Sequence, residues 1–102
     1  MRIFFMNTAV NTIAPGLRLD QCPKGAKVRV IDIKPQPLFG AQDERVSLRL
    51  KELGFLPGAP LKIIGFGLLG ADPLAVQVNG TKFALRRAEA AKIYVELLTT
   101  TP

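Results

Sequence analysis

The chain has 102 residues, the size of one domain, and its composition is 48% hydrophobic and 22% charged. These proportions are typical of a globular protein with its own core and exclude a wholly disordered chain. The net charge of +6 permits an acidic protein, a nucleic acid or an acidic lipid as partner. The lysines and arginines are scattered along the sequence, which favours an ordinary solvated surface over a phosphate-binding stripe.

Residues 1–16 are expected to form a partly disordered N-terminal extension. Its apolar run is too short for a signal peptide. The sequence contains no run of about 18 apolar residues, which is the length that would predict a membrane-spanning helix. The one cysteine, Cys22, cannot form an intramolecular disulfide, which favours a cytoplasmic protein. We interpret Cys22 as a small apolar packing residue.

A strand and a helix are the first elements expected in chain order. Apolar residues alternate over 26–33 but slip by one position at Ile31, which predicts a strand that either has a bulge or is buried on both faces at its end. Asp43 is a suitable N-cap for a helix that stops at Gly54, because glycine readily takes the left-handed conformation of a helix end. The apolar stripe of this helix consists of Val46, Leu50 and Leu53.

The next segment combines a turn with a strand. Pro57 and Gly58 predict a type II turn that leads into a strand over 61–66. Because proline cannot donate to a β-ladder, Pro60 requires that this strand begin late or lie at an edge.

Asn79 and Gly80 separate two β-type runs and predict a hairpin with a two-residue loop. Directly paired residues of a hairpin share a face. The predicted register therefore places on one face Leu74, Val76, Val78, Phe83 and Leu85.

A short helical turn over 87–91 and a last strand over 93–97 complete the chain. The last strand could close a barrel by pairing with an early one. Short strands at close spacing with one inserted helix predict a mainly β fold, a small barrel of about five strands.

Three parts of the chain share a pattern with one known family. They are residues 19–25 (LDQCPKG), residues 49–58 (RLKELGFLPG) and a closing part that includes DPLAV and ALRRAEAAKI, at 72–76 and 84–93. In this order they resemble the FeoA family, the ferrous iron transport protein A group.

The resemblance implies an SH3-like barrel over residues 17–97 with a tail over 98–102. It also implies a non-catalytic, cytoplasmic accessory protein of bacterial ferrous iron uptake, which binds and regulates a membrane ferrous permease that carries a GTPase domain. Related SH3-like domains occur in iron-responsive repressors, so a regulatory domain of that kind is a second interpretation.

Two arginines and a glutamate form the first candidate site for a partner. Arg86 and Arg87 are adjacent, and Glu89 follows them in the expected helical turn. They either pair locally or present a fork for a carboxylate or phosphate of a partner.

Apolar loop residues form the second candidate site. Phe39, Leu68 and Leu69 lie in expected loops, where they either cap the core or contact a partner. Five further residues are interpreted as structural turn and cap positions: Gly54, Pro57, Gly58, Asn79 and Gly80.

The sequence predicts neither a metal site nor an active site. It contains no histidine and one cysteine, so one chain cannot supply a tetrahedral nitrogen or sulfur site. We therefore expect no cofactor and no resident metal, and any description as a transition metal binder would come from the family alone. No nucleophile elbow, phosphate-binding loop or carboxylate pair predicts catalysis.

A basic barrel that binds nucleic acid is the main alternative from a different class. Its support is the charge alone, because Tyr94 is the one tyrosine, tryptophan is absent and no aromatic residues alternate with basic ones for base stacking. Salt-dependent binding of RNA or DNA would favour it. A homodimer formed through an exposed sheet edge is a further alternative.

Overall fold

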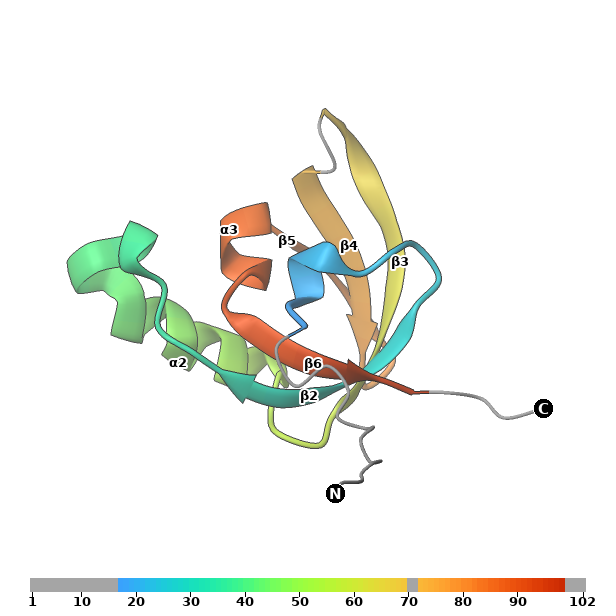
Figure 1. Cartoon of the computed structure of the whole chain (residues 1–102), viewed down its shortest axis with the longest axis horizontal. Helices are drawn as coiled ribbons and strands as arrows, with labels where there is room; N and C mark the ends of the chain where they lie inside the picture. The colour runs from blue at the N-terminus through green and yellow to red at the C-terminus, as the bar shows by residue number, and fades with distance from the viewer. Residues whose placement is uncertain (1–16, 70–71, 99–102) are drawn as a thin grey trace, which may run out of the picture.

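Five strands form one curved antiparallel sheet in the order β5-β4-β3-β2-β6 (Figure 1). The computed structural model describes residues 17–69 and 72–98, so the expected extension over 1–16 lies outside this part. The strands are β2 (Lys27–Ile33), β3 (Pro60–Leu69), β4 (Asp72–Val78), β5 (Thr81–Leu85) and β6 (Ile93–Leu97). The pairing of β6 with β2 confirms that the last strand joins an early one.

Helical segments cover the ends of the sheet. Helix α2 (Asp43–Leu53) is inserted between β2 and β3, and the single turn α3 (Arg87–Ala90) connects the edge strands β5 and β6 (Figure 1). Two 3-10 segments are also present, η1 (Leu19–Gln21) and η2 (Pro37–Gln42). The prediction of a mainly β fold with one inserted helix and a helical turn before the last strand is therefore confirmed.

The core lies inside the curve of the sheet and is closed by α2 and η1. Burying one large apolar side chain contributes about 1.5–3 kcal/mol, so a dozen such residues can stabilise a domain of this size. The large apolar side chains with at most 1% exposure are Leu19, Val28, Val30, Leu50, Phe55, Ile63, Leu74, Val76, Val78, Leu85, Ile93 and Val95. The ring of Phe55 lies 6.0 Å from that of Phe83 and so joins α2 to the hairpin.

The hairpin has the register that the sequence predicts. Leu74 pairs with Leu85 and Val76 with Phe83, across a loop in which Asn79 and Gly80 have φ of 52° and 79°. Positive φ at both loop residues is typical of a type I′ turn, whose twist matches that of the strands.

The helix stop and the turn after it are also confirmed. Gly54 has a φ of 113°, its N–H bonds to the carbonyl of Lys51, and the N–H of Phe55 bonds to that of Leu50. This is the Schellman arrangement, and its usual apolar contact is between the buried Leu50 and Phe55.

A type II turn leads from the helix stop to β3. Gly58 has a φ of 90°, and the N–H of Ala59 bonds to the carbonyl of Leu56 at 2.9 Å. The turn is fastened to β2, because Gly58 donates to Val30 and Val30 donates to Ala59.

Two details differ from the expectation. Asp43 is the first residue of α2 rather than its N-cap, which is Gln42, because its carboxylate bonds to groups outside the helix. Strand β3 begins at Pro60, an acceptable first position for proline, and it is longer than the predicted 61–66. The expected bulge in β2 is present, as a register shift between Val30 and Asp32.

Two glycines of β3 offer a matched test of the packing between β3 and β4. A Cβ at Gly67 would lie 2.6 Å from the carbonyl oxygen of Asp72 and 2.8 Å from Pro73, whereas a Cβ at Gly65 would meet nothing within 4 Å. We expect Gly67→Ala to lower the free energy of unfolding by about 1–3 kcal/mol, and Gly65→Ala to change it by less than about 0.5 kcal/mol. Urea denaturation measures both, and equal effects would contradict the close approach of the two strands.

Candidate functional site

The two predicted arginines lie in a charged cluster around α3, here called the α3 corner: Arg49, Asp72, Arg86, Arg87 and Glu89. Glu89 accepts the backbone N–H of Arg86 at 2.9 Å and the guanidinium of Arg49 at 2.7 Å. Asp72 accepts the backbone N–H of Arg87 at 3.0 Å. Both oxygens of Glu89 are therefore engaged within the chain, where they connect α3 to α2.

The side chains of Arg86 and Arg87 are exposed at this corner. A guanidinium presents several donors in a planar fork that matches a carboxylate or a phosphate. The structure thus brings the three predicted residues together but gives Glu89 an internal role. Its partner Arg49 lies 40 positions away in sequence, and nothing local in the sequence indicates that pair.

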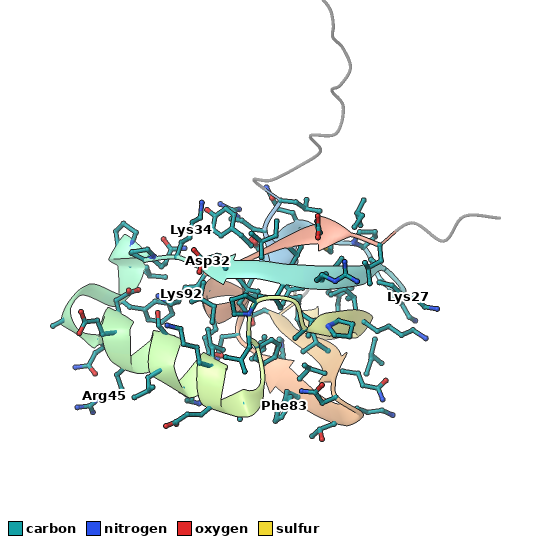
Figure 2. All side chains as sticks on the ribbon, turned by 90° about the horizontal axis from the view of Figure 1, so that it is seen from below. Lys27, Asp32, Lys34, Arg45, Phe83 and Lys92 are labelled. Carbon is teal, nitrogen blue, oxygen red and sulfur yellow. The ribbon has the colours of Figure 1, made fainter. Side chains whose placement is uncertain are left out.

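A buried lysine lies behind Phe39, the predicted apolar candidate. The side chain of Lys92 has no exposed surface, and its Nζ pairs with a carboxylate oxygen of Asp43. The same oxygen of Asp43 accepts the N–H of Gln36 at 2.9 Å. The ring of Phe39 is partly buried, and its centroid lies 5.7 Å from the ammonium of Lys92, which Figure 2 labels.

These contacts favour the charged form of Asp43. The hydrogen bond from Lys92, with that from Gln36 second, holds the pKa of Asp43 below its ordinary value of 3.8. Leu68 and Leu69, the other apolar candidates, end β3, and their side chains lie outside the described residues.

Removing Asp43 should cost more than removing the charge of Lys92, because the carboxylate of Asp43 is partly exposed and keeps the hydrogen bond from Gln36, whereas the ammonium is fully buried. Asp43→Ala leaves an ammonium buried without its counter-ion, whereas Lys92→Met fills a similar volume with an uncharged chain. We expect Asp43→Ala to be clearly less stable than Lys92→Met. Urea denaturation near neutral pH tests this order, and the reverse order would contradict it.

The pair should also make stability depend on acid. Because folding lowers the pKa of Asp43, the stabilisation is present above the ordinary value of 3.8 and disappears as the pH falls through the lower folded pKa. We expect the parent chain to lose more stability between about pH 5 and about pH 2.5 than Lys92→Met does, since that variant lacks the main cause of the shift. Equal losses would show that Lys92 does not control this titration.

Cys22 is a core residue, as the sequence analysis proposes. It is 3% exposed, and its thiol donates to the carbonyl of Arg18 at 3.6 Å. Burial, with the nearby charge of Asp20 second, raises the pKa of the thiol to about 11.

The thiol should therefore be inert in the folded chain. We expect a disulfide reagent at about pH 8 to leave native Cys22 unmodified for at least ten times longer than the urea-unfolded chain. Absorbance of the released thiolate gives both rates. Fast reaction of the native chain would place the thiol at the surface.

The described part of the chain contains neither a cluster of metal ligands nor a membrane-spanning helix. Over residues 17–69 and 72–98, no three side chains of the histidine, cysteine, aspartate or glutamate type come together in a group that could hold a metal ion. Over the same residues, no helix has the length and apolar character needed to cross a membrane.

A curved five-stranded sheet with one inserted helix and a helical turn before the last strand defines a small SH3-like domain. The family model of the FeoA domain matches residues 17–97. The chain therefore belongs to the FeoA family, as its motifs indicate.

Solved structures of the family share this fold. FeoA of Stenotrophomonas maltophilia, solved in complex with zinc, is 34% identical with a TM-score of 0.67, over 78% of this chain and 89% of that one. It is described as a prokaryotic SH3-domain protein and a candidate activating factor of ferrous iron transport. FeoA of Chlorobium tepidum is 31% identical with a TM-score of 0.69, over 84% of this chain and 74% of that one.

The same fold occurs in proteins of another kind. A manganese-dependent transcriptional repressor is 18% identical with a TM-score of 0.67, over 83% of this chain and 43% of that one, which shows the fold alone. A comparison with curated protein sequences gives no match.

Proposed function

We propose that this chain is a non-catalytic accessory protein of bacterial ferrous iron uptake. In this proposal it acts in the cytoplasm, through direct contact with a membrane ferrous permease that carries a GTPase domain. The observation that carries the proposal is the FeoA match over residues 17–97, together with 34% identity to a relative described in terms of ferrous iron transport. Iron is then the cargo of the permease and not a ligand of this chain.

The placement of the carboxylates supports binding rather than catalysis. The chain has eight acidic residues and no histidine. Within residues 17–69 and 72–98, ion pairs join Asp20 to Arg18, Asp43 to Lys92, Glu89 to Arg49 and Glu96 to Arg29. General acid–base work needs a titratable group within reach of a substrate, and a carboxylate engaged in holding the fold is poorly placed for it.

The absence of a resident metal stays a prediction. The chain's one thiol is buried and its pKa is raised, so it is a weak candidate for a ligand. The zinc of the Stenotrophomonas relative belongs to that protein. Equilibrium dialysis of the full chain against ferrous iron under anaerobic conditions measures the point directly.

Two alternatives follow from specific observations. The fold likeness to a transcriptional repressor supports a regulatory domain within a larger system, and the charge of +6 supports nucleic acid as partner. A homodimer through the open edge of β5 is compatible with either function, and light scattering distinguishes it from a monomer.

A pull-down tests the proposal and the role of the α3 corner together. The tagged chain is incubated with solubilised membranes of its own host at about 50 mM and about 300 mM salt. We expect the ferrous permease to be recovered, and Arg86→Ala/Arg87→Ala to reduce recovery about fivefold or more, because arginines at interfaces carry a large share of the binding energy.

The control variant is Arg45→Ala/Lys51→Ala, which removes the same charge from exposed positions of α2. It should bind like the parent chain. Recovery of nucleic acid alone, lost at the higher salt, would contradict the proposal and favour the nucleic-acid alternative.

A further inference from the structure

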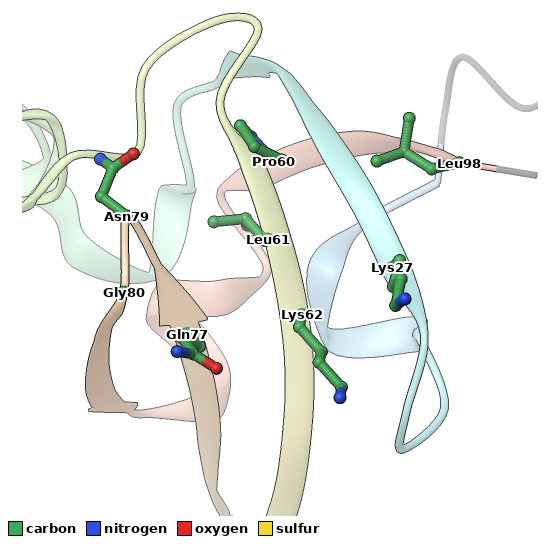
Figure 3. A pocket seen from close by; sticks show the side chains of 8 residues that line it. All are labelled: Lys27, Pro60, Leu61, Lys62, Gln77, Asn79, Gly80 and Leu98. Carbon is green, nitrogen blue, oxygen red and sulfur yellow. The ribbon is translucent and has the colours of Figure 1, made fainter. Parts of the chain in front are cut away.

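Three lysines that are far apart in sequence lie in one row across the outer face of the sheet. In the strand registers, Lys27 of β2 lies opposite Lys62 of β3, and Lys62 lies opposite Gln77 of β4. Gln77 in turn lies opposite Lys82 of β5. We call Lys27, Lys62 and Lys82 the lysine row. Figure 3 shows Lys27, Lys62 and Gln77 on three neighbouring strands at the same level.

The row faces away from the core. Its lysines are exposed, whereas their neighbours along the strands, such as Val28, Leu61 and Ile63, are buried. Within residues 17–69 and 72–98, no carboxylate forms an ion pair with a lysine of the row. The ammonium groups therefore remain available to a ligand.

Fold stability does not explain this arrangement. A lysine on an edge strand discourages strand pairing between molecules, and that purpose accounts for Lys82 on β5. It does not account for Lys27 and Lys62, which lie on interior strands. Like charges directly opposite each other in a sheet are destabilising, so placing Lys27 opposite Lys62 lowers the stability of the fold.

Two shallow depressions flank Lys62 on the same face. One, of about 320 Å³, lies toward Lys27 and has Pro60 and Leu98 among its walls (Figure 3). The other, of about 360 Å³, lies toward Lys82 and includes Ile64. No acidic residue and no aromatic ring lines either of them. Apolar recesses thus alternate with projecting cations.

We propose that this face binds an extended acidic protein segment, whose carboxylates contact the lysine row and whose apolar side chain enters a recess. Strands lie about 4.8 Å apart, so the row spans about 14 Å, and alternate side chains of an extended peptide recur about every 6.8 Å. Two or three carboxylates on one side of such a segment match the row within the reach of the flexible lysine stems.

The recesses favour a peptide over the other anionic partners. A lipid surface reaches the projecting ammonium groups but leaves the recesses unfilled, and single-stranded nucleic acid gains its stacking energy from aromatic rings that line neither recess. On the basis of the proposed function, we place the acidic segment in the cytoplasmic part of the ferrous permease.

Titration of the full-length, isotope-labelled chain by NMR tests the site with defined probes. The peptide probe has glutamates at alternate positions and one leucine at its centre, and the comparison probes are phosphatidylglycerol vesicles and a single-stranded oligonucleotide. We expect the peptide to shift the amides of residues 24–27, 61–64, 77 and 82. Shifts confined to other residues, or tighter binding of vesicles or oligonucleotide at the row, would overturn the inference.

The variant Lys62→Gln/Lys82→Gln should weaken peptide binding about fivefold, since exposed charge pairs each contribute a modest amount. The matched control is Arg45→Gln/Lys51→Gln on α2, which lowers the net charge equally and should bind like the parent chain. Equal weakening by both variants would mean that net charge and not the row determines binding, and would overturn the inference.

The same variants separate this inference from the proposed function. If Lys62→Gln/Lys82→Gln recovers the permease from membranes as well as the parent chain does, the row is not the contact and the proposed function stands. If the peptide binds at the row but no permease is recovered, the acidic-segment site stands and the proposed function fails.

Discussion

The ion pair between Lys92 and Asp43 joins the segment before β6 to the start of α2, which is not part of the sheet. Lys92 lies between α3 and β6, and Asp43 begins α2 on the far side of the η2 segment. A fully buried ammonium is tolerated only with a counter-ion and further polar contacts, which fixes where α2 must begin. The backbone of Lys92 adds to this, because its carbonyl accepts the N–H of Lys34 at the end of β2.

The rest of the helix position follows from that anchor. Of the residues of α2, Leu50 is the one that is fully buried, and Val46 and Leu53 pack against the core while partly exposed. With the first turn held by Asp43 and the last turn by the contact of Leu50 with Phe55, Arg49 is brought to Glu89. That contact in turn sets α3, which presents Arg86 and Arg87 at the surface.

Features coded by neighbouring residues could be predicted from the sequence. The register of the hairpin follows from Asn79 and Gly80, and the helix stop follows from Gly54, because each depends on backbone conformations that few other residues adopt. The role of Asp43 could not be predicted in this way. Its position suits an N-cap, and the competing partner is a lysine 49 positions later.

The lysine row shows the same limit for a surface. Its members are 35 and 20 positions apart, so in sequence they read as scattered charges. Only Lys82 could be placed beforehand, opposite Gln77 in the hairpin. The other two join the row through the registers of β2 with β3 and of β3 with β4, which no local signal defines.

The ion pairs and the lysine row involve different residues of this fold, and this difference bears on regulation. Among the described residues, ion pairs hold loops, helices and the β2–β6 edge, whereas Lys27, Lys62 and Lys82 are exposed and no acidic residue lines the two recesses beside them. The backbone of a sheet face is already ordered before binding. The loss of conformational entropy on binding therefore comes mainly from the lysine side chains. Contacts of this type are individually weak and sensitive to salt, which suits the proposed contact with a permease if that contact is reversible rather than permanent.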